Sequence, residues 1–280
     1  MSAQPVVSVV VPTHNRADYL DVTLSSLAAQ DFSEPWEVIV VDDGSSDGTA
    51  GALEGRPVRA LRHERPRGPN AARNTGIHVS SAELIALVDD DVLAPPGWLA
   101  ALVAGARAHP EAEALGGPIR ARLEGRPPRS CGRESPPVTT LDLGPTDRAA
   151  EMLWSANLLL RSSALERVGG FDEDLPIYGD EEEWIERLRE RGGRLAYIAA
   201  AGLEHRRDAR DARLGALMRS EFRRGRSSRA LDVRKGRRPG LAGELRVLAG
   251  CGWHTVRRAC PQGLVLAAHS AGRVREAVRF

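Results

Sequence analysis

Three short apolar runs, each closed by turn-forming or acidic residues, constrain the fold of this chain more than any other feature of its sequence. The runs cover residues 6–11, 38–41 and 84–88. They are closed by Pro12, by Asp42-Asp43-Gly44 and by Asp89-Asp90-Asp91. Apolar runs this short, each ended by polar or turn residues, are typical of strands that are buried on both faces.

Helical segments separate these expected strands. Leu20, Leu24 and Leu27 recur at helical spacing between the first two runs. Two more candidate helices and a weak strand near residues 57–63 lie between the second and third runs. The β-α-β-α alternation predicts a parallel sheet covered by helices. Ligands bind at the carboxyl ends of the strands in such sheets, so the three polar closures are expected to converge on one crevice.

The second half of the chain extends the pattern and then changes composition. We expect helices at 98–109, 162–168 and 180–191 and strands at 114–121, 152–160 and 195–200. The Pro-, Gly- and Arg-rich stretch 124–146 is expected to be a long functional loop that lines an acceptor pocket with residues 154–157. The predicted fold is α/β, a Rossmann-like, mostly parallel sheet flanked by helices over residues 1–206. An Arg-rich helical extension is expected over 207–280.

Composition excludes some classes of protein. A formal net charge of +1 over 280 residues gives no global electrostatic case for nucleic acid, and no recognition motif is present. No run of about 18 apolar residues and no signal peptide is visible, so we expect a cytoplasmic protein without a membrane span. Cys131, Cys251 and Cys260 have spacings that fit no zinc pattern, and three cysteines favour a reducing compartment over a disulfide framework.

The acidic triplet at residues 89–91 is the strongest chemical signal. Three adjacent carboxylates at the end of a buried strand repel one another, and burying their charge is costly. A divalent cation relieves this cost, and Mg²⁺ or Mn²⁺ typically binds through one or two carboxylates together with substrate phosphate oxygens. The alternative is a solvated acidic turn. The apolar run before the triplet and Pro95-Pro96 after it favour a metal site.

The first two strands end in groups suited to a nucleoside. Pro12, Thr13, Asn15 and Arg16 close the first strand, and Asp43 closes the second. A carboxylate accepts hydrogen bonds from base N–H groups and ribose hydroxyls. The alternative is an ordinary strand-to-helix connection with a capping side chain.

Two further segments carry candidate charges. Arg73, near the start of an expected helix, is placed beside a diphosphate, the alternative being an exposed helix arginine. Asp180 and Glu181 begin another expected helix, where a carboxylate facing the crevice can act as a general base. Acidic residues are also stabilising at any helix N-terminus, which is the alternative explanation.

These segments together resemble the family 2 glycosyltransferases of the GT-A fold. The resemblance covers about residues 6–205 and rests on the order of six segments: Val-Val-Pro-Thr-His-Asn-Arg (10–16), Val-Asp-Asp-Gly-Ser-Ser-Asp (41–47), Ala-Ala-Arg-Asn-Thr-Gly (71–76), Asp-Asp-Asp-Val (89–92), Gly-Gly-Phe-Asp (169–172) and Gly-Asp-Glu-Glu-Glu-Trp-(x2)-Arg (179–187). It implies an inverting transfer from a nucleoside-diphosphate sugar, with UDP the expected nucleotide, to a hydroxyl acceptor such as a glycan, a lipid-linked sugar or a small molecule. It also implies a role in polysaccharide biosynthesis.

The resemblance also implies roles for particular residues. Pro12, Thr13 and Asp43 match positions that hold the nucleoside, and Arg73 matches one near the donor. Asp89 and Asp91 match the Asp-x-Asp pair that contacts ribose and a Mg²⁺ or Mn²⁺ ion, with Asp90 as a further participant and His205 as a metal ligand or lid contact. The family's catalytic base is the Asp of a Glu-Asp pair. The order here is Asp180-Glu181, which favours Glu181 as base and keeps Asp180 as the alternative.

Other functions remain open from the sequence. A sugar nucleotidyltransferase would normally show a Gly-rich phosphate loop after the first strand, and residues 10–16 do not. A non-catalytic nucleotide- or glycan-binding relative is favoured only by the Asp180-Glu181 order. The extension over 207–280 alternates arginines with apolar residues, a pattern compatible with peripheral contact to an anionic membrane or with packing inside the protein.

Overall fold

The structure is a computed structural model that describes residues 4–129, 131, 138–175, 179–237 and 239–278. The chain divides into two compact units, each described by itself. The first unit comprises Met1–Ala121, Thr139–Glu173 and Asp180–His205. The second comprises Arg122–Val138, Asp174–Gly179 and Arg206–Phe280.

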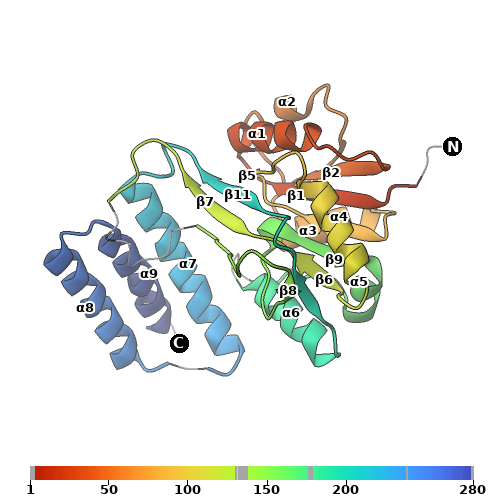
Figure 1. The fold of residues 1–280 in the computed structure, drawn as a ribbon. Helices are drawn as coiled ribbons and strands as arrows, with labels where there is room; N and C mark the ends of the chain where they lie inside the picture. Colours follow the sequence, from red (N-terminus) through yellow and green to blue (C-terminus); the bar gives the residue numbers. More distant parts are fainter. Residues whose placement is uncertain (1–3, 130, 132–137, 176–178, 238, 279–280) are drawn as a thin grey trace. The chain divides into compact units, whose positions relative to one another are not determined.

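An eight-stranded sheet forms the centre of the first unit (Figure 1). Its strands, in sheet order, are β3 (Arg59–Arg62), β2 (Trp36–Asp42), β1 (Val7–Thr13), β4 (Leu84–Leu87), β9 (Leu158–Arg161), β6 (Ala114–Gly116), β10 (Leu195–Tyr197) and β8 (Arg148–Ala149). The first four strands of this order are parallel, as are β6 and β10. All seven residues of β1 are buried, which confirms that its apolar run is covered on both faces.

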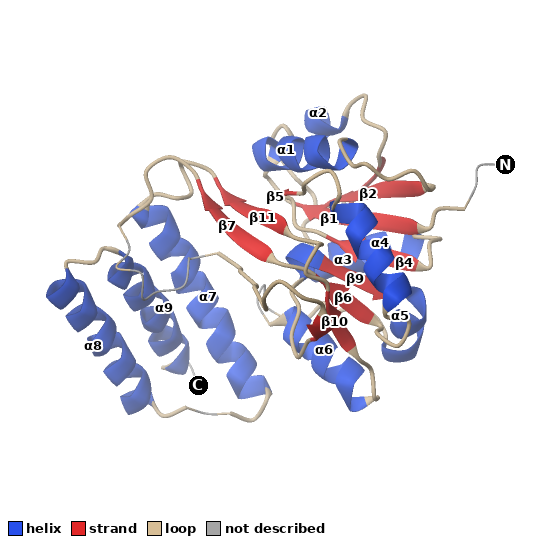
Figure 2. Cartoon of the chain, viewed as in Figure 1, coloured by secondary structure: helices blue, strands red, loops and turns tan. Residues whose placement is uncertain are grey.

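Helices cover both faces of the sheet, as Figure 2 shows. One face packs against α1 (Ala17–Ala28) and α4 (Trp98–Ala108) through a core that includes Leu20, Leu24 and Leu102. The other face packs against α3 (Pro69–Val79), α5 (Ser162–Val168) and α6 (Asp180–Glu190). A short helix, α2 (Thr49–Leu53), contacts α1. The predicted α/β fold with a mostly parallel sheet is therefore confirmed.

Two strand predictions were wrong in detail, and one sheet was not predicted. The strand expected over 114–121 is two strands in different sheets, β6 and β7 (Ile119–Leu123), because Gly116, Gly117 and Pro118 interrupt it. The strand expected over 152–160 is only β9, preceded by a 3₁₀ turn, η1 (Ser155–Asn157). A second sheet of β5 (Val92–Leu93), β11 (Leu203–Arg207) and β7 was not expected at all.

The second unit contains three long helices, α7 (Leu214–Arg234), α8 (Leu241–Arg258) and α9 (Gln262–Ala277), which confirms the helical extension. Gly225 and Gly272 allow α7 and α9 to approach closely, because a Cβ on either would lie within about 2 Å of a carbonyl oxygen of the other helix. The Arg273 guanidinium donates to both Glu244 and Asp232. Within the described part of the chain, no helix combines the length and the apolar character needed to cross a bilayer.

Candidate active site

The acidic triplet follows β4 and lies at the carboxyl ends of the parallel strands. Asp90 and Asp91 are buried, whereas the Asp89 side chain keeps 29% of its exposure. Thr13, at the end of β1, donates a hydrogen bond to Asp90 Oδ2 at 2.7 Å. Two of the predicted polar closures therefore meet directly, as expected for neighbouring parallel strands.

Arg16 pairs with the inner two carboxylates of the triplet. Its Nη1 lies 3.1 Å from Asp90 Oδ1, and its Nη2 lies 2.7 Å from Asp91 Oδ2. The guanidinium carbon also lies 4.2 Å from the centroid of the Tyr19 ring. Burial raises the pKa of Asp90 to about 7, and the positive charge of Arg16 partly opposes that rise.

His205 reaches the same cluster from β11. The β11–β5 ladder pairs His205 with Val92, one residue after the triplet, and brings His205 Nε2 within 3.0 Å of Asp91 Oδ1. Its Nδ1 lies 3.2 Å from the backbone oxygen of Thr139, and such a bond orients a metal-binding imidazole. Each of Asp89, Asp91 and His205 offers one ligand atom, and these three atoms lie within 4.8 Å of one another. Two carboxylates and an imidazole can hold Mn²⁺ or Mg²⁺.

Asp43 organises the loop that leads into α3. Its carboxylate accepts hydrogen bonds from the backbone N–H groups of Arg67 and Gly68, each at 2.8 Å. His63 Nδ1 lies 2.7 Å from Asp43 Oδ1, and its Nε2 lies 3.0 Å from Thr75 Oγ1. These contacts occupy most of the acceptor capacity of Asp43, so this carboxylate positions the loop between β3 and α3.

The turn after β2 requires a glycine. Gly44 has a φ of +70°, and a Cβ at this position would lie 2.9 Å from the backbone of Arg65 and Pro66. A residue with a side chain would therefore have to adopt a strained conformation and displace the neighbouring loop.

The turns after β1 and β2 are tied together by Asn15. This residue has a φ of 54°, its backbone N–H donates to Ser45 Oγ at 2.9 Å, and its Oδ1 accepts from the Ser46 N–H at 2.7 Å. His14 Nδ1 lies 2.7 Å from the backbone oxygen of Asp43. Pro12 is buried in β1 opposite Val41. Asn15 therefore fixes the turn after β1 against the turn after β2.

Arg73 lies between the acidic triplet and the start of α6. This buried guanidinium contacts Asp89 Oδ1 at 3.3 Å, donates to Ser155 Oγ at 2.8 Å and forms an ion pair with Asp180. Arg73 is only 6% exposed, which excludes the alternative of an exposed helix arginine.

Glu181 and Asp180 start α6 side by side. Ser155 Oγ donates a hydrogen bond to Glu181 Oε1 at 2.5 Å. Burial and the negative charge of Glu181 raise the pKa of Asp180 well above its ordinary value. Burial alone would raise the pKa of Glu181 as well, but the Arg73 charge and hydrogen bonds from Asp180 and Ser155 lower it below the ordinary value. The environment therefore favours the ionised form of Glu181 more than that of Asp180.

Three residues of the site carry no clear signal in the sequence. Ser155 lies in the expected acceptor region but gives no hint that it holds Glu181. His63 is a single histidine at the end of a weak strand. Thr23, on α1, donates from Oγ1 to the backbone oxygen of Asp90 at 2.7 Å and accepts from the Val92 N–H at 3.1 Å, so it supports the turn of the triplet. Each of these contacts joins residues far apart in the chain.

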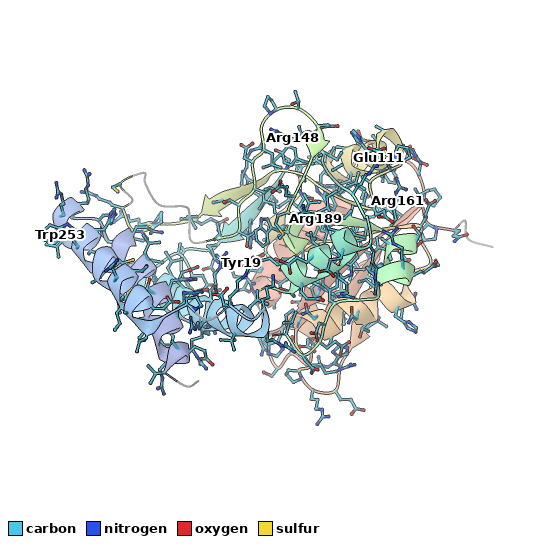
Figure 3. The ribbon with its side chains drawn as sticks, turned by 90° about the horizontal axis from the view of Figure 1, so that it is seen from below. Tyr19, Glu111, Arg148, Arg161, Arg189 and Trp253 are labelled. Atoms are coloured by element: carbon cyan, nitrogen blue, oxygen red, sulfur yellow. The ribbon has the colours of Figure 1, made fainter. Side chains whose placement is uncertain are left out.

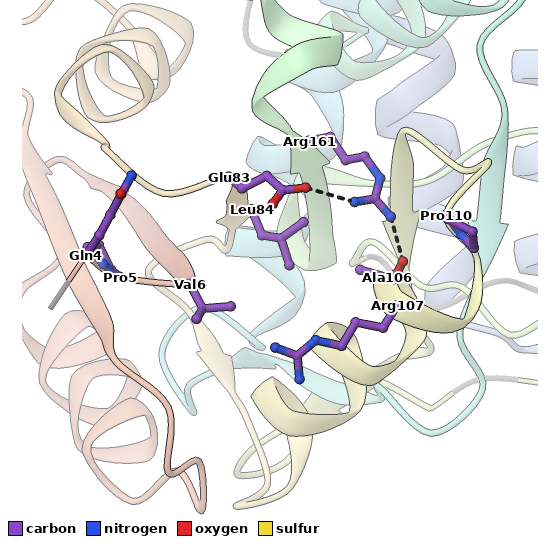
Figure 4. A pocket seen from close by; sticks show the side chains of 9 residues that line it. All are labelled: Gln4, Pro5, Val6, Glu83, Leu84, Ala106, Arg107, Pro110 and Arg161. Atoms are coloured by element: carbon purple, nitrogen blue, oxygen red, sulfur yellow. Dashed lines mark hydrogen bonds and ion pairs between the residues drawn. The ribbon is translucent and has the colours of Figure 1, made fainter.

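A hollow of about 490 Å³ lies elsewhere on the first unit, beside the starts of β1 and β4 (Figure 4). Arg161 lines it and donates to Glu83 and to the backbone oxygen of Ala106, as Figure 4 shows. It lies at the amino ends of these strands, opposite the acidic triplet. Because the carboxylates, the histidine and Arg73 gather at the carboxyl ends, we place the candidate site there.

Comparison with known proteins identifies the family of the chain. The sequence model of Glycosyl transferase family 2 matches residues 8–169, more than half of the chain. Among curated proteins, the chain is 35% identical over 218 residues to the pre-mycofactocin glycosyltransferase of Mycobacterium tuberculosis, covering 73% of this chain and 44% of that protein. It is 31% identical over 209 residues to the validoxylamine A glucosyltransferase of Streptomyces hygroscopicus subsp. jinggangensis, covering 64% and 50% respectively. The chain thus spans about half the length of these relatives.

Solved structures show the same fold at low sequence identity. The mannosyltransferase PcManGT from Pyrobaculum calidifontis, in complex with GDP-Man and Mn²⁺, has a TM-score of 0.61 at 19% identity, covering 99% of this chain and 74% of that one. Residues 1–349 of TarS from S. aureus, in complex with UDP-GlcNAc, have a TM-score of 0.55 at 20% identity, covering 78% and 66%.

Proposed function

The chain belongs to Glycosyl transferase family 2, and from this premise we propose that it transfers a sugar from a nucleoside-diphosphate sugar to a hydroxyl acceptor with inversion at the anomeric carbon. The observation that carries the proposal is the position of the Glu181 carboxylate, which is held by Ser155 and linked through Ser155 and Arg73 to the acidic triplet. A base and a phosphate-binding cluster thereby share one edge of the sheet.

The donor would bind along the ends of β1, β2 and β4. Pro12, Thr13, Asn15, Arg16, Asp43, Arg73, Asp89 and Asp90 are the proposed contact residues. The buried Asp43 and Asn15 would act mainly by fixing the loops, and Arg73 would offer its charge to the diphosphate. Solved relatives of the same fold hold GDP-Man or UDP-GlcNAc. We propose UDP as the nucleotide here.

Asp89, Asp91 and His205 would hold Mn²⁺ or Mg²⁺. Their ligand atoms lie within 4.8 Å of one another, and His205 presents Nε2 because its Nδ1 faces a backbone carbonyl. A bound divalent ion neutralises charge that develops on a diphosphate leaving group. Arg16 pairs with Asp90 and Asp91 and would help to balance the charge of the triplet around the ion.

Glu181 would act as the general base. It would accept the proton of the acceptor hydroxyl as the hydroxyl oxygen forms a bond to the anomeric carbon. The bond from that carbon to the diphosphate oxygen breaks on the opposite face, and the nucleoside diphosphate leaves with the electron pair. Asp180 is the alternative base, but its raised pKa and its ion pair with Arg73 favour a positioning role.

We propose that residues 1–206 form the transferase domain and that 207–280 form an extension that contacts the inner face of a membrane, where a lipid-linked acceptor would be presented. The exposed apolar residues of α8 support this: Leu245, Val247, Trp253 and Val256 are 46–77% exposed. Figure 3 shows Trp253 projecting from the surface of this helix. Co-sedimentation with anionic vesicles at moderate salt tests the contact, and recovery of all the protein in the supernatant would contradict it.

Release of nucleoside diphosphate tests the transferase proposal directly. Purified chain would be incubated with Mn²⁺ or Mg²⁺ and a panel of UDP-, GDP-, dTDP- and CMP-linked sugars. Slow metal-dependent release from one donor, lost in Asp91→Ala, is the expected result. If no donor releases its nucleotide and no free nucleotide shows metal-dependent binding, the result would instead favour a non-catalytic binding protein.

A further inference from the structure

The second unit contains a cluster of metal-ligating side chains apart from the candidate active site. Cys131 belongs to the segment between β7 and β8, His254 lies in the last turns of α8, and Cys260 follows α8. Each of these residues offers one ligand atom, and the three atoms lie within 4.8 Å of one another. We propose that these three residues bind Zn²⁺, an assignment independent of the transferase proposal.

The spacing of the ligand atoms fits tetrahedral zinc. Zn–S distances of about 2.3 Å and Zn–N distances of about 2.0–2.1 Å place a sulfur and a nitrogen ligand about 3.6 Å apart, and two sulfurs about 3.8 Å apart. Cys131 Sγ lies 3.6 Å from His254 Nε2. Small side-chain rotations would bring all three atoms onto one ion, and a water molecule would complete the tetrahedron.

The backbone at the end of α8 presents Cys260 to the cluster. Ala259 adopts the left-handed conformation with a φ of 46°, although glycine is the usual residue there. The Cys260 N–H donates back to the Thr255 oxygen at 3.1 Å, so the chain reverses and carries Cys260 toward His254. A left-handed alanine costs roughly 1 kcal/mol, which a bound ion would offset.

Arg129, two residues before Cys131, contacts the same turn. The Cys260 thiol, which is only 2% exposed, donates to the backbone oxygen of Arg129 at 3.8 Å. The cluster therefore joins Cys131 to the α8–α9 turn of the same unit, across 123 residues of sequence between Cys131 and His254. A metal ion at this place would stabilise the second unit as a cross-link does.

The ligand chemistry selects the ion. Two thiolates and a neutral imidazole balance the charge of a divalent cation, and each thiol releases its proton on binding. Thiolates favour zinc over Mg²⁺ and Mn²⁺, whereas the carboxylates of the active site favour the harder ions. The chain would thus carry two metal sites with different preferences, one in each unit.

Cobalt substitution tests the assignment. Reduced full-length chain would be stripped with a chelator, exchanged into chelator-free buffer and titrated with Co²⁺. We expect a thiolate-to-cobalt charge-transfer band and tetrahedral d–d bands that saturate at one equivalent and are lost when one equivalent of Zn²⁺ is added. A reduced wild-type chain without the charge-transfer band would overturn the proposal.

Variants identify the ligands. Cys131 is exposed, so Cys131→Ser should leave the fold intact, abolish the charge-transfer band and weaken Zn²⁺ binding by about 100-fold or more, since even groups behind a ligand contribute 10–100-fold. Cys251→Ser is the matched control, because Cys251 contacts Ser270 on α9 and lies outside the cluster. Asp91→Ala should keep the band. An unchanged band in Cys131→Ser, or a Cys131–Cys260 disulfide in freshly purified protein, would contradict the assignment.

Discussion

At the scale of single residues, Arg73 and Ser155 favour the ionised form of Glu181 at the start of α6. Arg73 offers its positive charge to Asp180, Asp89 and Glu181, and Ser155 donates specifically to Glu181. The two carboxylates therefore have opposite pKa shifts although they are adjacent in sequence. A pair of titratable groups whose environments separate their pKa values is a common feature of acid–base sites.

The Ser155 hydroxyl should set the acid limb of the pH–rate profile. Its hydrogen bond stabilises the charged form of Glu181 and lowers the pKa, so Ser155→Ala should raise that pKa toward the ordinary value. A hydrogen bond to a charged group contributes about 1.5–3 kcal/mol, so its loss should move the acid limb clearly to higher pH. Donor hydrolysis measured from pH 3 to pH 8 would show it.

The control for this experiment is Ser163→Ala, an exposed serine on α5. It should keep the wild-type profile. If the rate of Ser155→Ala falls equally at every pH and the acid limb keeps its wild-type position, Ser155 has a purely structural role.

At the scale of elements, the turn after β2 depends on Gly44. Its φ of +70° and its contact with the backbone of Arg65 and Pro66 leave no room for a side chain. Gly44→Ala should lower the free energy of unfolding by about 2–3 kcal/mol, because conformational strain and a backbone clash act together.

Gly55 supplies a matched control for that prediction. It has the same φ of +70° but open space where a Cβ would lie, so Gly55→Ala should cost only about 1 kcal/mol. Urea unfolding of both variants measures the difference. Equal losses in the two variants would show that the contact with the loop before α3 contributes nothing.

The start of α6 makes a prediction about stability and pH. The raised pKa of Asp180 means that the folded chain keeps a proton that the unfolded chain releases above about pH 4. Because the folded state then binds more protons, this residue lowers stability as pH rises from its ordinary pKa to the raised one. Asp180→Asn carries no such proton, so its stability deficit relative to wild type should be smaller at pH 7 than at pH 4.

Urea unfolding at the two pH values, with Glu190→Gln at the exposed end of α6 as control, measures this difference. A deficit that grows with pH would mean that Asp180 is ionised against Arg73 in the folded protein.

The elements differ in how well the sequence predicts them. The runs that became β1, β2 and β4 are continuous and apolar, so local pattern is enough to identify them. The insertion of β9 antiparallel between β4 and β6 depends on pairing across 71–77 residues with β4 and 42–46 residues with β6, which no local pattern contains. β11 alternates polar and apolar residues so weakly that only its pairing with β5 and β7 defines it.

At the scale of the whole molecule, the sequence predicts residues of the site better than their contacts. The carboxyl ends of parallel strands bring Thr13 and the acidic triplet together, as topology alone requires. The joint role of Ser155 and Glu181, and the cluster of Cys131, His254 and Cys260, depend on chain segments that meet only in the folded units. Ligand spacing along the sequence therefore gave no sign of that cluster.

Binding of metal and nucleotide should stabilise the first unit. A ligand present at 100 times its dissociation constant contributes about 2.7 kcal/mol, enough to raise an unfolding temperature by several degrees. We expect this shift from Mn²⁺ together with UDP, and its loss in Asp91→Ala, when the first unfolding transition is followed by calorimetry. Asp31→Asn, which changes an exposed carboxylate, should keep the shift. An undiminished shift in Asp91→Ala would place the ion elsewhere.

The turnover of Glu181→Gln tests the central claim most directly. Nucleoside-diphosphate release and donor affinity would be measured in parallel, with Glu186→Gln, an exposed position on the same helix, as control. If Glu181 is the base, release should fall by about 10²–10⁴-fold while donor affinity changes little, because the carboxylate acts on the acceptor proton. Unchanged release in Glu181→Gln would contradict the account and assign the proton to another group.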